Sequence, residues 1–198
     1  MSQAVANAGI ERRAFVSELL EKCPQALVVT GLGSSSYDVF AAGDRPENFY
    51  LWGAMGGAAA VGLGLALAQP ERSVVVVTGD GEQLMGLGVL ATIGVQQPAN
   101  LSIVVLDNGH FGETGMQRSH TSQGVSLAAI ARGCSFKHVI EIQEQGAVGP
   151  LADTVNARAG CTLAQVLVRA DELPRALPPR DGVHIKNRFR AALGFAPF

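Results

Sequence analysis

Short apolar runs alternate along this chain with stretches whose apolar residues recur at helical spacing. Residues 73–78 include four consecutive valines, and residues 26–30 and 101–106 are similarly apolar. Continuous runs of this kind are typical of strands that are covered on both faces. Residues 12–23 instead place their apolar side chains on one helical face. The alternation predicts an α/β fold in which a parallel sheet is sandwiched by helices.

The same pattern gives an order of elements and a division of the chain. The expected strands are 26–30, 48–52, 73–78, 101–106, 136–140 and 162–168. The expected helices are 12–23, 54–69, one that carries Leu84, Leu87, Leu90 and Val95, 126–132 and 147–158. We expect residues 1–172 to form one domain. Residues 173–198, which are rich in proline and basic residues, would form a C-terminal extension that packs on this domain or on a partner.

Composition narrows the class of protein. Hydrophobic residues make up 47% of the chain and charged residues 16%, which is ample for a buried core. The net charge of −2 argues against a nucleic-acid partner. The three cysteines lie far apart and match no zinc motif, which favours free thiols in a reducing compartment. Residues 1–13 lack the apolar stretch of a signal peptide, and no apolar run is long enough for a bilayer. We therefore expect a cytoplasmic protein without membrane contact.

Glycine-bearing loops follow three of the predicted strands. They are Gly31-Leu32-Gly33-Ser34, Gly79-Asp80-Gly81-Glu82 and Asn108-Gly109-His110. Ligands of open α/β sheets bind at the carboxyl ends of the strands, where adjacent parallel strands would bring Asp80 and Asn108 together. Carboxylate, amide and backbone carbonyl oxygens suit magnesium, which completes its shell with phosphate and water. Glycines beside a helix start let backbone N–H groups approach a diphosphate.

Two other interpretations of these loops are open. Asp and Asn at strand ends are commonly turn or cap residues. Alternatively, Gly79, Gly81 and Gly86 could form a dinucleotide-binding turn, with Asp107 as the ribose-binding acid. That alternative fits poorly, because Asp107 lies further from the glycines than the roughly 20 residues of the usual motif. Asp80 would also repel a pyrophosphate unless a metal ion intervened.

The sequence Gly79-Asp80-Gly81, followed by Asp107-Asn108, resembles the signature of thiamine diphosphate enzymes. The resemblance implies that Mg²⁺ is held by Asp80, Asn108 and the backbone carbonyl of His110. The segment around Trp52 resembles the one that this family places beneath the cofactor. By that resemblance the Gly53 carbonyl accepts a hydrogen bond from the cofactor's amino group, and Met55 holds its two rings in a V shape. These two residues would act catalytically through the cofactor's conformation.

Residues 48–56, 90–94 and 113–121 resemble more closely the phosphonopyruvate and sulfopyruvate decarboxylases. The resemblance implies a diphosphate-binding (PP) domain that serves as the β subunit of a 2-oxo acid decarboxylase, releasing CO2 and an aldehyde. Relatives often carry an arginine where this chain has Ser36-Tyr37-Asp38, and Glu82 replaces a small residue. The implied cofactor-binding residues are Gly31, Gly33, Ser34, Gly53, Met55, Gly79, Asp80, Gly81, Glu82, Asn108, His110, Phe111, Gly112 and Thr114. His120 could touch substrate, although a solvated loop residue is the simpler interpretation.

The resemblance also implies a missing part. The family's cofactor needs a glutamate from a pyrimidine-binding domain, and the elements predicted above leave no sequence to build that domain. We therefore expect a separate α subunit, in an α2β2 or larger hetero-oligomer, that completes the site for a small 2-oxo acid. A carboligase subunit like that of acetolactate synthase, or a non-catalytic regulatory subunit, are the alternatives.

Overall fold

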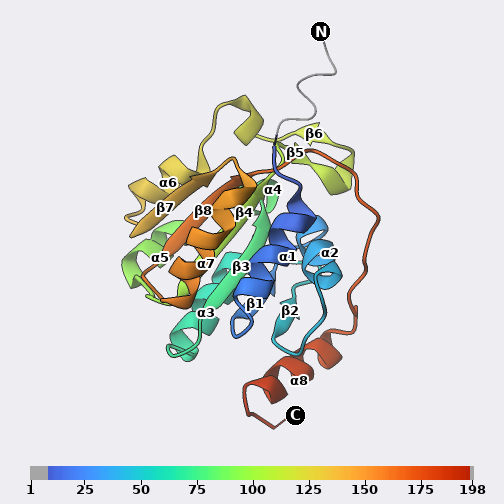
Figure 1. The fold of residues 1–198 in the computed structure, drawn as a ribbon, viewed down its shortest axis with the longest axis vertical. Helices are drawn as coiled ribbons and strands as arrows, with labels where there is room; N and C mark the ends of the chain where they lie inside the picture. The colour runs from blue at the N-terminus through green and yellow to red at the C-terminus, as the bar shows by residue number, and fades with distance from the viewer. Residues whose placement is uncertain (1–8, 197–198) are drawn as a thin grey trace.

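Six parallel strands form the centre of the molecule, in the order β2-β1-β3-β4-β8-β7 (Figure 1). The computed structural model describes residues 9–196, so the first eight residues of the predicted domain and the last two of the predicted extension lie outside the described residues. The strands are β1 Leu27–Thr30, β2 Asn48–Tyr50, β3 Val74–Gly79, β4 Leu101–Asp107, β7 His138–Ile142 and β8 Thr162–Leu167. All neighbouring pairs run parallel. A small antiparallel hairpin, β5 His110–Phe111 with β6 Gln117–Arg118, stands apart from the sheet.

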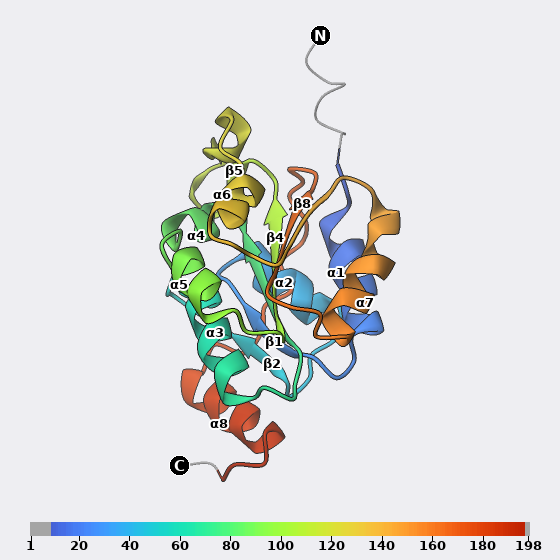
Figure 2. The same cartoon turned by 90° about the vertical axis from the view of Figure 1, so that its left-hand side faces the viewer.

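Helices cover both faces of this sheet (Figure 2). On one face lie α1 Arg12–Lys22, α2 Ser34–Ala41 and α7 Val148–Asn156, and on the other lie α3 Ala58–Ala68, α5 Val89–Gln96 and α6 Leu127–Gly133. The valines of β3 alternate between them: Val75 and Val77 join the first core, and Val74 and Val76 join the second. This alternation is the two-residue period of a strand. The predicted α/β fold with a sheet between helices is confirmed.

Several predicted elements differ from the structure. The helix expected through Leu84 and Val95 is two helices, α4 Asp80–Met85 and α5, separated at Gly86–Gly88. Any side chain on Gly86 would collide with the backbone carbonyl of Gly56, so two loops touch where the helix was expected to continue. The helix expected over 54–69 begins only at Ala58, and the strand expected over 136–140 is β7, shifted toward the C-terminus. Helix α2 was not predicted.

The C-terminal segment contains a helix, α8 Gly182–Ala192, which was not predicted within the expected extension. Asp181 caps its first turn by accepting hydrogen bonds from two backbone N–H groups. The helix packs on the edge strand β2, with the Phe189 and Phe49 rings 5.5 Å apart in a T-shaped arrangement. Arg188 forms an ion pair of 2.6 Å with Asp44. In this structure the segment therefore covers the edge of the sheet that β2 would otherwise expose.

The carboxyl ends of the central strands lie at one edge of the sheet, which we call the carboxyl edge. Helix α4 and the β5–β6 hairpin lie together there (Figure 1). Among residues 9–196, none of the helices has the length and apolar character needed to cross a bilayer.

Candidate functional site

A cavity of about 220 Å³ opens at the carboxyl edge. It gathers most of the site residues that the sequence predicts. Gly31, Gly33 and Gly53 do not line it. The predicted residues that do are Ser34, Met55, Gly79, Asp80, Gly81, Glu82, Asn108, His110, Phe111, Gly112 and Thr114.

Asp80 is the most deeply buried charged residue of the predicted set. It follows β3 directly, begins α4 and has only 2% of its surface exposed. Its Oδ2 accepts hydrogen bonds from the hydroxyls of Ser119 and Thr121, the second at 3.1 Å. None of the ion pairs among the described residues involves Asp80. Burial, as the largest cause, raises the pKa of Asp80 to about 6.

Asn108 follows the neighbouring strand β4 and forms a tight turn with His110. Its Oδ1 accepts a hydrogen bond of 2.9 Å from the His110 backbone N–H, and its carbonyl oxygen lies 2.7 Å from His110 Nδ1. Gly109 between them has a φ of +70°, a conformation that glycine adopts without strain. β3 and β4 are paired up to Gly79 and Leu106, so Asp80 and Asn108 leave adjacent strands at the same edge. The expected juxtaposition is present.

Asp107 has a different environment from Asp80, although both end neighbouring strands. Its Oδ1 accepts from the Gly109 N–H at 3.0 Å and from the Thr121 hydroxyl at 2.7 Å, and its Oδ2 accepts from Gln165 at 2.6 Å. It does not line the cavity. Both oxygens are therefore used inside the fold, which argues against the ribose-binding role of the dinucleotide alternative.

The two glycines of the first loop contact acidic side chains and do not line the cavity, whereas Leu32 and Ser34 of the same loop do. Glu82 Oε2 accepts a hydrogen bond of 2.9 Å from the Leu32 N–H, and a side chain on Gly31 would collide with the same carboxylate. Burial raises the pKa of Glu82. Gly33, with φ +77°, lies beside Glu113. Direct contact of these two glycines with a diphosphate stays a prediction, and the structure gives them the role of fitting the loop against Glu82 and Glu113.

The segment before α3 borders the mouth of the cavity. Gly53 has a φ of +74°, and a side chain placed there would meet open space. Met55 lines the cavity while 40% of its surface is exposed. The preceding Trp52 donates its indole N–H to the Pro179 carbonyl at 2.8 Å, which ties this segment to the C-terminal one. Met55 thus lies in the wall of the cavity with part of its side chain exposed, whereas Gly53 does not line the cavity.

The β5–β6 hairpin forms another wall. A side chain on Gly81 would lie 2.6 Å from the Phe111 ring, so a glycine at position 81 lets the hairpin approach α4. Thr114 donates to Gln117 at 2.8 Å, which closes the tip of the hairpin. The ring of His120 contacts Phe111 edge-on at 6.2 Å, and this side chain does not line the cavity.

Three residues at this site have no role that the sequence motifs predict. Ser119 and Thr121 hold the Asp80 carboxylate, and their position in the family-like segment 113–121 was the only signal for them. Arg12 lines the cavity from the start of α1, and no motif surrounds it.

The donor groups fit the predicted metal. Within residues 9–196 no three His, Cys, Asp or Glu side chains cluster as metal ligands. The predicted site contains only one residue of these types, Asp80, because its other ligands are the Asn108 amide and a backbone carbonyl. The lack of such a cluster therefore does not conflict with it. A buried carboxylate without a cationic partner, next to an amide oxygen and an open cavity, suits a magnesium ion that keeps phosphate and water ligands.

Comparison with known proteins decides the family. The family model "Thiamine pyrophosphate enzyme, C-terminal TPP binding domain" matches residues 32–166. The chain belongs to the thiamine pyrophosphate enzymes. This confirms the resemblance seen in the glycine motifs, and the matched range contains every predicted site residue except Gly31.

Relatives of this TPP-binding domain differ in length. It is 40% identical to a phosphonopyruvate decarboxylase of Streptomyces viridochromogenes over 94% of its own length, but spans only 47% of that protein. It is 31% identical to the sulfopyruvate decarboxylase subunit beta of Methanococcus maripaludis, covering 93% of this chain and 98% of that one. A putative thiamin diphosphate-dependent enzyme of Mycobacterium smegmatis shares the fold, with a TM-score of 0.69 at 23% identity, covering 83% of this chain and 32% of that one.

Proposed function

We propose that this chain is the β subunit of a split, thiamine diphosphate- and magnesium-dependent 2-oxo acid decarboxylase that releases CO2 and an aldehyde. The observation that carries the proposal is the buried, cation-free Asp80 beside Asn108 at the carboxyl edge. The names of the relatives support a substrate like phosphonopyruvate or sulfopyruvate. Residues 1–172 would be the TPP-binding domain and 173–198 its extension, in a cytoplasmic enzyme.

We assign roles to the residues of the cavity on this basis. Asp80, Asn108 and the His110 carbonyl would hold Mg²⁺, and the amides of Gly81 and Glu82 would contact the diphosphate. The Gly53 carbonyl and Met55 would set the conformation of the cofactor. When bound, thiamine diphosphate supplies the electron sink for decarboxylation.

Other residues of the chain prepare this site. The Ser119 hydroxyl donates to Asp80, and the Thr121 hydroxyl shares its one hydrogen between Asp80 and Asp107. Both contacts favour the charged form of Asp80 and fix its orientation. Phe111 packs on Gly81 at the start of α4. A pre-formed and partly dry site strengthens the attraction between ions.

A partner subunit would complete the enzyme. Met55 and Met85 both line the cavity yet are 40% and 65% exposed, as expected of apolar side chains that another chain covers. The relative whose length this chain matches is named a subunit beta. We propose that an α subunit with a pyrimidine-binding domain docks here in an α2β2 or larger assembly, and brings the missing glutamate.

The test is reconstitution with the product of an adjacent gene for a pyrimidine-binding domain. The chain and this partner, purified separately and mixed with Mg²⁺ and thiamine diphosphate, should convert a 2-oxo acid to CO2 and an aldehyde, while the chain alone should show no turnover. Pyruvate, sulfopyruvate and phosphonopyruvate should be compared. Acyloin instead of aldehyde would identify a carboligase. Absence of magnesium-dependent cofactor binding in the mixture would refute the proposal.

A further inference from the structure

Arg12 is a buried cation in the wall of the cavity. It is the first residue of α1, and only 7% of its surface is exposed. It lines the cavity together with Asp80, Gly81 and Asn108, and also lines an adjoining polar pocket of about 140 Å³ that shares Asn108 with it. Burial of an arginine is costly unless its charge is used, so its position needs an explanation.

The fold fixes the place of Arg12 at the carboxyl edge. Two residues before it, Ile10 pairs with the end of the sheet: its N–H donates to the Leu167 carbonyl at 3.0 Å, and its carbonyl accepts from the Arg169 N–H at 2.9 Å. Gly9, with φ +127°, lets the backbone approach Arg169 closely. Helix α1 therefore starts directly beside β8, and its first side chain is held at the cavity.

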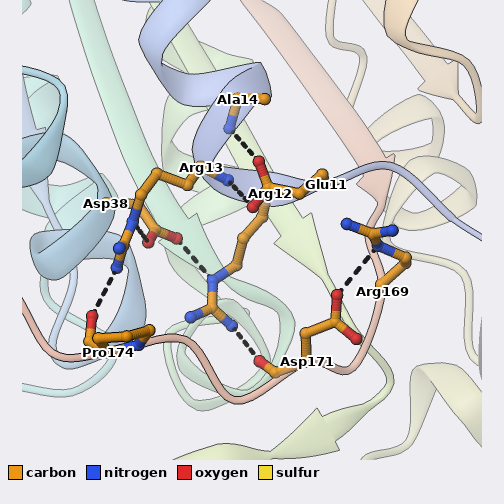
Figure 3. Close-up of polar contacts among 8 residues, drawn as sticks. All are labelled: Glu11, Arg12, Arg13, Ala14, Asp38, Arg169, Asp171 and Pro174. Atoms are coloured by element: carbon orange, nitrogen blue, oxygen red, sulfur yellow. Dashed lines mark hydrogen bonds and ion pairs between the residues drawn. The ribbon is translucent and has the colours of Figure 1, made fainter.

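Specific hydrogen bonds orient the guanidinium (Figure 3). Arg12 Nε donates to Asp38 Oδ2 at 2.6 Å, and Nη1 donates to the Asp171 carbonyl at 3.0 Å. Arg13 donates to the other oxygen of Asp38 at 3.1 Å and to the Pro174 carbonyl at 2.9 Å. The carboxylate of Asp171 pairs with Arg169 at 3.0 Å rather than with Arg12.

Arg12 has no carboxylate of its own among its partners. The guanidinium groups of Arg12 and Arg13 share the single carboxylate of Asp38. Arg12 is also the one lysine or arginine among the described residues that line the cavity, opposite the acids Asp80, Glu82 and Glu113. A diphosphate and Asp80 together carry more negative charge than one divalent ion neutralises. A second cation in the wall would offset the remainder.

We propose that Arg12 is a cofactor-binding residue whose guanidinium donates to the diphosphate of bound thiamine diphosphate. The inference rests on the proposed function and extends it to a residue outside the glycine motifs. Asp38 and the Asp171 carbonyl fix the fork of donors in advance, which reduces the entropy that binding costs. The opposing explanation is that Arg12 only joins α1 to α2 through Asp38.

Arg13 provides the matched control, because it binds the same carboxylate but does not line the cavity. Affinities for thiamine diphosphate and for inorganic pyrophosphate, each at saturating Mg²⁺, should be measured by calorimetry in the full chain, alone and with its partner. We expect Arg12→Gln to weaken both ligands about tenfold or more, which corresponds to about 1.4 kcal/mol. Arg13→Gln should change them less than about twofold. Arg12→Lys, which keeps the charge without the fork, should fall between.

The outcomes separate the alternatives. If Arg12→Gln and Arg13→Gln lower thermal stability alike and leave both affinities unchanged, Arg12 is structural and the inference is wrong, while the proposed function stands. A raised KM for the 2-oxo acid with unchanged cofactor affinity would also overturn it. No binding by the wild-type chain, with or without its partner, would refute both. If Arg12→Gln does not fold, the double variant Arg12→Gln, Asp38→Asn also removes the acid that Arg12 leaves unpaired. The inference then requires that this double variant bind pyrophosphate more weakly than Asp38→Asn alone.

Discussion

Two buried aspartates at the carboxyl edge have opposite electrostatic surroundings. Asp38, which is fully buried in α2, accepts hydrogen bonds from two guanidinium groups. Asp80, which is nearly as buried, accepts side-chain hydrogen bonds from the hydroxyl groups of Ser119 and Thr121 and forms no ion pair with a described residue. Since a buried charge is stable only when it is paired, the first carboxylate has its cations within the chain, and the second would gain one from the proposed Mg²⁺. The contrast favours a structural role for Asp38 and supports the proposed ligand-binding role of Asp80.

Replacement of Asp80 should have the largest effect of all. Asp80→Ala should lower the affinity for thiamine diphosphate with Mg²⁺ by about 1,000-fold or more, roughly 4 kcal/mol, because the only carboxylate of the proposed metal site is lost. The fold should persist, since no ion pair of the described residues depends on this side chain. Calorimetry with a circular-dichroism control measures both. Unchanged cofactor affinity would remove the metal assignment.

Replacement of Asp38 should affect stability instead. Asp38→Asn leaves the guanidinium of buried Arg12 without its anionic partner, and removing one member of a buried pair costs about 3–5 kcal/mol. Arg13, the second partner of Asp38, is partly exposed, so water can solvate its charge after the replacement. The loss of Asp38 therefore costs less at Arg13 than at buried Arg12. Urea unfolding should show the loss as a lower midpoint with an unchanged slope. A variant as stable as the wild type would mean that Asp38 is not the structural acid described above.

The buried carboxyl group of Asp80 should also make the stability of the chain depend on pH. In the metal-free chain the pKa of Asp80 is about 6, above its ordinary value of 3.8, so the folded state binds its proton more tightly than the unfolded state. Ionisation of Asp80 therefore lowers the free energy of unfolding. This loss is absent below pH 3.8, grows as pH rises to about 6 and is then complete, at most about 3 kcal/mol. Above pH 6, bound Mg²⁺ should restore this lost stability. Below pH 6, Mg²⁺ should bind more weakly, because Asp80 becomes protonated. Urea unfolding of the wild type and Asp80→Asn, from pH 4 to 8, checks this; parallel profiles would contradict it.

The sequence predicted the region around Asp80 better than the region around Asp38. The valine strand, the glycines and the strand-ending Asn108 are local signals, so the sheet and this part of the cavity followed from them. Helix α2 was missed because it starts with three serines, which are poor helix formers without an apolar period. The break before α5 depends on Gly86 touching the distant Gly56, and the burial of Arg12 depends on contacts with residues 38 and 171. Long-range contacts of this kind leave no periodic trace.

The smallest expected effect concerns the hydroxyl groups that bind Asp80, in the place that arginine side chains take around Asp38. Ser119→Ala removes one donor to the Asp80 carboxylate, and a hydrogen bond to a charged group contributes about 1.5 kcal/mol. Cofactor affinity at pH 7.5 should therefore fall about tenfold. Because this hydrogen bond lowers the pKa of Asp80, its loss should also move the pH dependence of Mg²⁺ binding to higher pH.

Ser122→Ala is the matched control for this last variant. Ser122 lies in the same segment, but its hydroxyl bonds to the Ser119 carbonyl and to Arg118, not to Asp80. Its replacement should leave the affinity within about twofold, because the Ser122 hydroxyl makes no hydrogen bond to Asp80. Equal losses in both variants would show that the segment acts by its folding alone. A loss confined to Ser119→Ala would show that hydroxyl donors keep Asp80 charged and ready for a cation, as the arginines do for Asp38.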